Sequence, residues 1–425
     1  MLSWLRRRLR FGPLEPWQRD QYVVVSTVAL AHIAFDLTQP FIPLYVLELG
    51  VTDLADAAFW SGVIIGTGPL GSGLMGPVWG AMADRYGRKP MVLRAMIMIG
   101  IMQVAMAFAP NVQVLLALRV IMGLFAGFTP MVMALAISVT PREKMAQAIG
   151  MVQAATFLPL AIGPTIGGLI SDTLGLRTNF VLTGVLLLIP AALLWFMVKE
   201  PGFGDSANKK GAERGPRGSM LTLLALPGFA VGVGIMFLAR FTDRALPPIL
   251  PLYLIELNTP SAQLATITGF VVGCGAVAAA CSSMLYGRWA RPERTRKLLL
   301  IALGGGAVFS AVLAIVSSWP EVVVVRIILG LLAGGTMSLA YTMGARLAPP
   351  AQSGLTLSML SSGGQLGGAL SPMMAGLISQ ISLSVALLAN AGAYLIAFAL
   401  AALASTGRAP APETADELRA GQRTS

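Results

Sequence analysis

The sequence consists largely of apolar blocks of about 20 residues or more, separated by short polar segments, and this pattern restricts the fold severely. A helix of about 20 residues crosses the hydrocarbon core of a bilayer, which is about 30 Å thick. Within lipid, every backbone N–H and C=O group must be paired inside the protein, so such blocks must be helical. Only 12% of the residues are charged, too few to cover a soluble domain. We therefore predict an all-α integral membrane protein.

Twelve apolar blocks are predicted to span the membrane. Their ranges are 22–47, 59–83, 91–109, 112–139, 145–171, 178–198, 222–255, 262–286, 296–317, 320–347, 353–379 and 382–405. The start of the chain has arginines among apolar side chains, which is typical of an amphipathic segment bound to the membrane surface. The middle segment is polar, which is typical of a flexible linker. The expected domains are an amphipathic segment (1–21), a six-helix bundle (22–198), a cytoplasmic linker (199–221), a second six-helix bundle (222–405) and a disordered tail (406–425).

The net charge of +11 is unevenly distributed among the connections between these blocks. If both termini are cytoplasmic, 25 of the 30 Lys and Arg residues lie in cytoplasmic segments, and only Arg177 lies in an outer connection. The positive-inside rule therefore predicts cytoplasmic termini and a multi-pass protein of a bacterial inner membrane. This placement accounts for the basic charge without nucleic acid as a partner.

The two halves of the sequence repeat each other. The segment PLYVLEL at 43–49 returns as PLYLIEL at 251–257, an offset of 208 residues. An arginine followed by glycines at four-residue spacing begins at Arg119 and returns at Arg326, an offset of 207 residues. These matches predict two parallel six-helix bundles related by a pseudo-twofold axis along the membrane normal, with a central site that opens by rocking of the bundles.

The polar loop GAMADRYGRK at 80–89 follows the second block and resembles the signature loop of the major facilitator superfamily. The resemblance implies a cytoplasmic gating motif made of Gly80, Asp84, Arg85, Gly87, Arg88 and Lys89. We expect Gly80 to permit close helix packing, and Arg85 or Arg88 to form ion pairs at the inner side. The alternative is that these residues are ordinary positive-inside charges.

The fifth block resembles the antiporter motif of drug-exporting members of that superfamily, which ends in Gly-Pro-x-x-Gly-Gly. Its residues, called the antiporter motif below, are Gly150, Pro159, Gly163, Pro164, Gly167 and Gly168. Pro159 stands where a glycine is usual. Such a helix can kink and approach a neighbour closely, and generic packing is the alternative role. The whole chain resembles twelve-span bacterial drug:proton antiporters, which implies the major facilitator fold and favours export.

Ionisable side chains inside the predicted spans are candidates for proton coupling, because each costs roughly 2.5–3.5 kcal/mol or more in a bilayer. His32, Asp36 and Gln39 share one helical face. We predict that Asp36 exchanges protons and His32 relays them, whereas a role for Arg119 follows from its match to the family's fourth-span arginine. The predicted central-cavity ion pairs involve Arg240, Asp243, Arg244 and Arg326. Static structural pairs are the alternative.

The predicted substrate cavity is lined by polar and aromatic side chains. These are Gln39, Phe35, Phe128, Gln153, Phe157 and Gln365, with helix-to-helix packing as the alternative role of the glutamines. We predict a proton-coupled exporter of small amphipathic compounds. A dedicated exporter of one metabolite such as a siderophore, or a proton-coupled importer or uniporter, is the alternative. The chain carries one His and two Cys and no phosphate-binding loop, so we expect no enzyme, no cofactor and no metal site. The expected partners are a small-molecule substrate, protons and the lipid bilayer, with the protein as a monomer.

Overall fold

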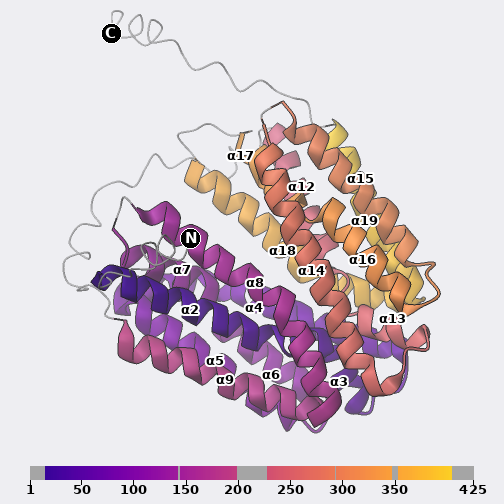
Figure 1. Cartoon of the computed structure of the whole chain (residues 1–425), viewed down its shortest axis with the longest axis horizontal. Coiled ribbons are helices and arrows are strands. Elements are labelled where there is room, and N and C mark those ends of the chain that lie inside the picture. Colours follow the sequence, from indigo (N-terminus) through magenta and orange to yellow (C-terminus); the bar gives the residue numbers. More distant parts are fainter. Residues whose placement is uncertain (1–14, 142–143, 199–226, 292, 347–352, 404–425) are drawn as a thin grey trace, which may run out of the picture.

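The computed structural model describes residues 15–141, 144–198, 227–291, 293–346 and 353–403 (Figure 1). The regular secondary structure within these ranges is helical, as an all-α membrane fold requires. The predicted linker (199–221) and tail (406–425) lie outside the described residues. Of the amphipathic segment, only residues 15–21 are described, and they already enter the first helix.

Each of the twelve predicted spans coincides with one helix or with two or three helices in series. The single helices are α4 (Leu54–Tyr86), α5 (Arg88–Ala107), α8 (Met145–Leu174), α9 (Leu176–Met197), α14 (Leu264–Trp289), α15 (Thr295–Leu313), α18 (Ser353–Ser379) and α19 (Leu383–Leu403). The interrupted spans are α2 (Pro16–Asp36) with η1 (Gln39–Phe41) and α3 (Ile42–Glu48), α6 (Val112–Phe125) with α7 (Phe128–Ser138), α12 (Pro227–Arg244) with α13 (Leu250–Glu256), and α16 (Trp319–Ala333) with α17 (Thr336–Arg346). A short helix, η3 (Ser261–Gln263), precedes α14.

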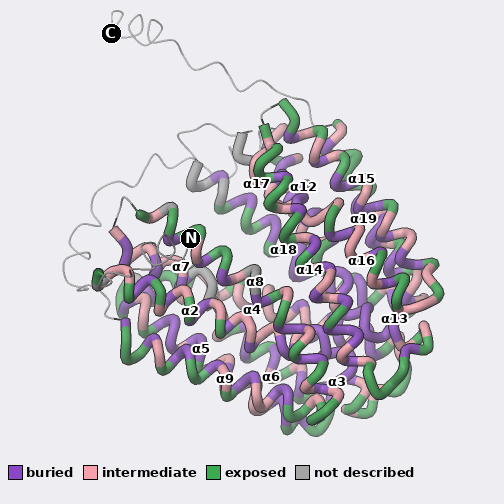
Figure 2. The backbone as a smooth tube through the Cα atoms, in the orientation of Figure 1, coloured by how far each residue is buried: buried purple, intermediate pink, exposed green. Residues whose placement is uncertain are grey.

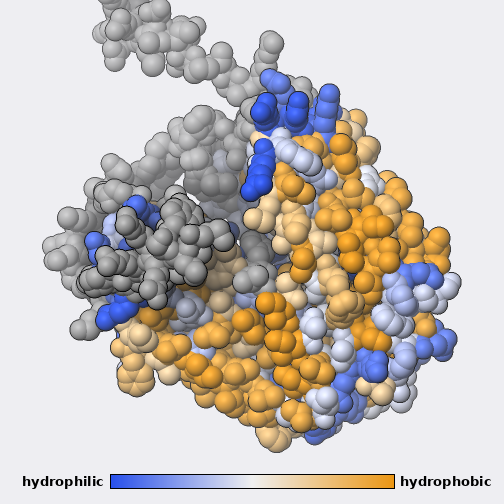
Figure 3. Space-filling view, viewed as in Figure 1, coloured by the Kyte–Doolittle hydropathy of each residue, from blue (hydrophilic) through white to orange (hydrophobic). Residues whose placement is uncertain are grey.

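The flanks of the helices carry many exposed apolar side chains. Figure 3 shows hydrophobic side chains along the flanks of both halves and hydrophilic side chains gathered towards the ends of the helices. By length and hydropathy alone, eight segments of the described residues qualify as membrane spans. The spans that fall short are α4, α18, α6 with α7, and α12 with α13. The first two are rich in glycine and serine, and the other two are interrupted.

The interruptions correct the prediction that the first, fourth, seventh and tenth spans are continuous helices. Pro40 and Pro43 follow the end of α2, and Pro247, Pro248 and Pro251 follow the end of α12. Proline lacks an amide hydrogen and clashes with the preceding helical turn, so α-helix cannot run through these segments unbroken. The breaks occur in equivalent spans of the two halves, as the internal repeat requires.

A glycine makes the break in the fourth span. Gly127 has a φ of +113°, a conformation that glycine adopts without a steric penalty. The carbonyl groups released by the break are hydrogen-bonded by two side chains from the same half. Trp79 Nε1 donates to the Leu124 carbonyl at 2.7 Å, and Arg94 Nη2 donates to the Phe125 carbonyl at 3.3 Å. The break is therefore compatible with a membrane interior.

The two halves, α2–α9 and α12–α19, meet along two helix pairs, α4 with α18 and α8 with α14. Glycines bring the backbones into contact. A methyl group added to Gly62 of α4 would overlap the Pro372 carbonyl of α18, and one added to Gly269 of α14 would overlap the Pro164 carbonyl of α8. We call this interface the seam. It lies at the end of the molecule that carries α3 and α13 (Figures 1 and 2), which we call the closed end.

The same helices separate towards their other ends. No atom of the described residues lies within 4 Å of the position a methyl group would take on Gly73, Gly76 or Gly80 of α4, and Leu74 is 74% exposed. Gly287 of α14 is equally free of neighbours. We call this the open end, and Figure 1 shows the halves diverging towards α7 and α17 there. The structure therefore has one seam closed and the opposite ends of the halves apart.

Candidate functional site

The centre of the molecule is built where α2 and α12 end. Asp36 is the last residue of α2, and Arg244, its counterpart in the repeat, is the last residue of α12. A helix C-terminus disfavours a negative charge and favours a positive one, so Asp36 occupies an electrostatically poor place and Arg244 a good one. The proline breaks thus decide where these two charges lie.

Asp36 is covered on one side by α8. A methyl group added to Gly163 would lie 2.8 Å from the Asp36 Cβ, and one added to Gly167 would overlap the Leu37 carbonyl. Asp36 is half-buried and forms no hydrogen bond or ion pair with any described residue. Its carboxyl group is therefore available to a proton.

Arg244 acts electrostatically on Asp36 from the opposite half, but the two do not form an ion pair within 4.0 Å. The ion pairs of α12 are internal. Asp243 lies 3.5 Å from Arg240 and 3.7 Å from Arg244. Arg326 on α16 also acts electrostatically on Asp243. The structure therefore brings the predicted charges together, with Asp243 shared by arginines and Asp36 held apart.

His32 lies one turn before Asp36 on the same face of α2. Its Nδ1–H donates to the Val28 carbonyl at 2.9 Å, which leaves Nε2 as the acceptor nitrogen. The ring packs on Phe128 of α7, with 5.9 Å between the ring centroids. This hydrogen bond fixes the imidazole while keeping one nitrogen able to take a proton.

Two arginines have buried nitrogens without a hydrogen-bond acceptor in the described part of the chain. Arg119 on α6 is 2% exposed, and its Nε and Nη2 have no acceptor in the described part of the chain. Arg326, its counterpart on α16, has a Nε without an acceptor and packs closely against Gly275 of α14. A buried cation without a partner is costly, so a group that offsets its charge in another arrangement of the halves would be favoured.

The glutamines of the predicted cavity lie on the seam faces of their helices. Gln365 lies 7 residues, or two helical turns, before Pro372, which contacts α4. Gln153 lies 11 residues, or three turns, before Pro164, which contacts α14. Both are exposed because the halves have separated at this level. We therefore expect them to face the space between the halves, and their role in the substrate cavity stays a prediction.

The aromatic residues predicted with these glutamines are placed differently. Phe35 packs against the core at the closed end, which also contains residues of the second half. Phe128 packs against the core of the first half and His32. Gln39 is half-buried in η1, and the Phe157 side chain lies outside the described part of the structure. Phe35 thus packs against this core here, and its role in the substrate cavity stays a prediction.

Comparison with known proteins identifies the architecture. The family model described as Major Facilitator Superfamily matches residues 24–292 and 230–424. The multi-drug resistance efflux pump PmrA homolog of Lactococcus lactis is 31% identical over 74% of this chain and 76% of its own length. The multidrug resistance protein MdtG of Yersinia enterocolitica is 32% identical, over 77% of this chain and 78% of its own.

The chain belongs to the major facilitator superfamily. It is a membrane transporter and not an enzyme, as the sequence predicted. A crystal structure of a bacterial homolog of the human lysosomal transporter Spinster, inward-facing and unoccupied, has a TM-score of 0.75 at 19% identity, covering 94% of this chain and all of that one. The nucleoside transporter NupG has a TM-score of 0.70 at 12% identity, covering 90% of this chain and all of that one. These structures share its fold.

Two residues of the major facilitator gating motif, Arg88 and Lys89, donate hydrogen bonds to carbonyl groups of the first half. Arg88 Nη1 donates to the Ala134 carbonyl of α7 at 2.9 Å, and Lys89 Nζ donates to the Trp195 and Val198 carbonyls at 2.7 and 2.8 Å. Arg85 is exposed and stacks over Tyr86. The Asp84 side chain lies outside the described part, so the inner ion pairs stay a prediction.

The structure shows the surroundings of two glycines of that motif, Gly80 and Gly87. Gly80 does not pack closely, because α4 and α18 have diverged where it lies. Gly87 has a φ of +107° and makes the turn between α4 and α5, for which glycine is suited. The sequence suggested packing for the first of these and left the turn unassigned.

The antiporter motif of this major facilitator chain uses two faces of α8. Gly163 and Gly167 receive the end of α2, whereas Pro164 and Gly168 receive α14 of the opposite half. Gly150 is exposed, with no atom of the described part of the chain within 4 Å of an added methyl group, and Pro159 is buried. The motif therefore joins the helix that carries Asp36 to the seam.

The sequence analysis missed Asn179, which completes this arrangement. Asn179 on α9 is 1% exposed, and its Nδ2 donates to the Leu37 carbonyl at 2.7 Å and the Gly167 carbonyl at 3.1 Å. It satisfies a carbonyl released by the break after Asp36. A single asparagine inside an apolar block was the available signal.

Proposed function

We propose that this transporter is a proton-coupled exporter that exchanges protons for small amphipathic compounds. The observation that carries the proposal is Asp36, a carboxyl group at the centre without an ion pair in the described chain, facing Arg244 of the opposite half. Loss or gain of a proton changes the attraction between these groups across the seam. A change of protonation can therefore shift the balance between two arrangements of the halves.

The direction of transport is supported by relatives and by charge. Relatives of this chain are named multi-drug resistance efflux pumps in Lactococcus lactis and in Streptococcus pneumoniae, the latter 30% identical over 81% of this chain. The basic connections favour cytoplasmic termini and an inner-membrane location, which makes the open end the cytoplasmic end. In this arrangement a solute would enter the space between the halves from the cytoplasm.

The substrate class follows from the lining of that space. Gln153 and Gln365 offer hydrogen bonds there, and apolar Leu74 is exposed on the diverging part of α4. Neutral polar groups within apolar surroundings suit amphipathic molecules of varied shape. We propose a monomer in the lipid bilayer, with a small molecule and protons as its partners.

The test is uncoupler-sensitive efflux from cells that lack their own efflux pumps, measured with a panel of amphipathic drugs. We expect wild-type protein to lower drug accumulation and an uncoupler to abolish the effect. Asp36→Asn should remove proton-driven export, whereas Asp56→Asn, the same change at an exposed acid in the first turn of α4, should not. Undiminished proton-driven export by Asp36→Asn would exclude Asp36 from coupling.

The same panel separates the remaining candidates. Export restricted to one compound would indicate a dedicated metabolite exporter. Greater accumulation of a solute in cells that express the protein would indicate an importer. Transport that continues unchanged with an uncoupler would indicate a uniporter.

A further inference from the structure

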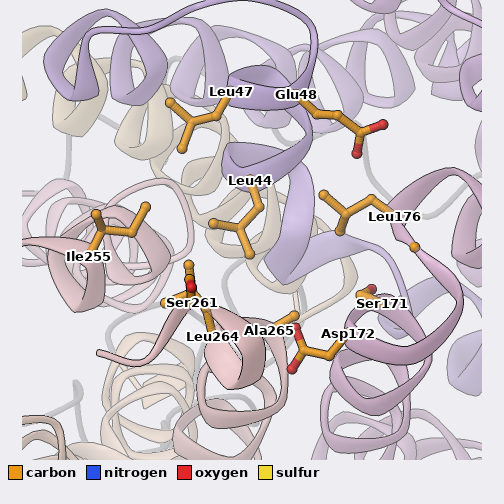
Figure 4. A pocket seen from close by; sticks show the side chains of 11 residues that line it. Leu44, Leu47, Glu48, Ser171, Asp172, Leu176, Ile255, Ser261, Leu264 and Ala265 are labelled. Carbon is orange, nitrogen blue, oxygen red and sulfur yellow. Dashed lines mark hydrogen bonds between the residues drawn. The ribbon is translucent and has the colours of Figure 1, made fainter. Parts of the chain in front are cut away.

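A carboxylate of one half caps a helix of the other half at the closed end. Asp172 lies near the end of α8, in the first half. Its Oδ1 accepts from the Ala265 amide at 3.1 Å and its Oδ2 accepts from the Thr266 amide at 2.7 Å. These amides belong to the first turn of α14 in the second half. Figure 4 shows Asp172 directed towards Ala265.

Helix α14 has no cap of its own. The residue at its N-cap position, Gln263, makes no side-chain hydrogen bond to the first turn. The equivalent helix of the first half, α4, is capped from within, because Asp53 accepts from the Ala55 and Asp56 amides at 2.8 and 3.0 Å. The first amides of a helix need acceptors, and a carboxylate there also offsets the helix dipole. In α14 that acceptor comes from the opposite half.

The cap adjoins close backbone contacts of the seam. Gly168, four residues before Asp172, would overlap the Ala265 carbonyl if it carried a methyl group. The Thr165 hydroxyl, one further turn away, donates to the Gly269 carbonyl at 3.4 Å. Asp172 thus extends the contact between α8 and α14 to the end of both helices.

The cap can also break without leaving buried polar groups unsatisfied. A pocket of about 350 Å³ adjoins Asp172 and Ala265, and it is lined in addition by Leu44, Glu48 and Leu264. Asp172 is half-buried at its edge. When α8 and α14 separate, water from this pocket can replace both hydrogen bonds. Such a contact is reversible, as a gate requires.

We propose that Asp172 is the latch of the closed end, formed when the halves are shut there and broken each time that end opens. The proposal rests on the alternating movement in the proposed function, and it makes Asp172 a positioning residue that acts through the seam. Without the two hydrogen bonds of Asp172, the arrangement in which this end is shut loses stability. The arrangement in which this end is open has the same stability as before, because the hydrogen bonds are absent from it. Asp172→Ala should therefore increase the ratio of open to shut molecules, by about tenfold if the two hydrogen bonds together are worth 1.4 kcal/mol.

The experiment measures the distance across the closed end by electron spin resonance. Spin labels are placed at Thr178→Cys on α9 and Ala262→Cys in η3, both exposed, in a Cys274→Ala/Cys281→Ala background in lipid nanodiscs. We expect Asp172→Ala to add a longer-distance population. Glu48→Ala is the matched control, because Glu48 lines the same pocket but pairs with Arg177 of its own half at 3.0 Å. It should leave the distances unchanged.

A second variant separates a latch from a simple helix cap. Gln263→Asp in the Asp172→Ala background supplies α14 with a cap of its own. We expect it to restore the melting temperature while the longer-distance population persists. An unchanged distance distribution in Asp172→Ala would overturn the proposal, and so would its full reversal by Gln263→Asp.

The distances are recorded without substrate or proton gradient. A negative drug panel therefore refutes export and leaves the latch standing, whereas unchanged distances refute the latch and leave export standing.

Discussion

At the scale of single residues, some charged side chains at the centre of the transporter form ion pairs and others do not. Asp243 is shared by Arg240 and Arg244, while Arg119 is buried with two nitrogens that lack acceptors in the described chain. A buried unpaired charge destabilises the arrangement that contains it. These residues are therefore better suited to a changing structure than to a single rigid one.

Arg119→Met should stabilise the protein and abolish its transport. Methionine has a similar length and no charge to bury, and replacing buried ionic groups by apolar ones gains about 1–4 kcal/mol in other proteins. Melting temperature in detergent and efflux in cells measure the two effects. A fall in melting temperature would show that Arg119 has a stabilising partner in this arrangement.

Gly163→Ala should impair export, because the added methyl group would lie 2.8 Å from the Asp36 Cβ and force α8 away from α2. A cost of about 1–3 kcal/mol is typical of such overpacking. Gly150→Ala is the matched control on the same helix, since its methyl group would meet no atom within 4 Å. The measurements are thermal unfolding and the initial rate of drug efflux. Equal effects of the two variants would contradict the packing described for α8.

At the scale of helices, the fold depends on breaks that the sequence analysis did not foresee. The repeat of Gly127 as Gly334 was evidence of duplication, but the spacing carries no information on backbone angle. Pro40 and Pro247 were visible, yet proline also occurs within unbroken helices here, as Pro69 and Pro164 do. Whether proline ends a helix depends on which partners satisfy the released carbonyls. Those partners are distant in sequence.

Trp79→Phe should destabilise the fourth span by about 1 kcal/mol, the usual net value of one hydrogen bond. Phenylalanine retains a ring but cannot donate to the Leu124 carbonyl at the break. Trp195→Phe is the control, because that ring is 60% exposed on α9. Thermal unfolding of the two variants in the same detergent is the measurement. A smaller loss at Trp79 than at Trp195 would mean that water satisfies the carbonyl equally well.

At the scale of the whole molecule, the sequence predicted the spans, the correspondence between the spans of the two halves, and the family. Hydropathy and duplication can be read from the chain alone. The sequence did not predict which ends of the halves touch. That depends on close contacts such as Gly62 with Pro372, where backbone meets backbone across more than 300 residues. Asp172 was overlooked for the same reason, since an acid near the end of a span has no distinguishing pattern.

The two ends of α4 should differ in access to water. In a Cys274→Ala/Cys281→Ala background, Gly76→Cys should react quickly with a charged thiol reagent, because no described atom lies within 4 Å of that position. Ser61→Cys, at a fully buried position near the closed end, should be protected. Labelling rates in nanodiscs give the comparison. Fast labelling at Ser61→Cys would indicate that the halves are parted at both ends or open the opposite way.

Several helices of the seam and of the centre do not qualify as membrane spans by length and hydropathy. They are α4 and α18 of the seam, α12 with Arg240 and Arg244, and α6 with Arg119, which is apolar but only 14 residues long. Such segments enter a bilayer poorly alone, since insertion depends on the summed transfer energy of each segment. We expect their insertion during synthesis to require helices already in place, so that assembly of this transporter is cooperative at these four spans.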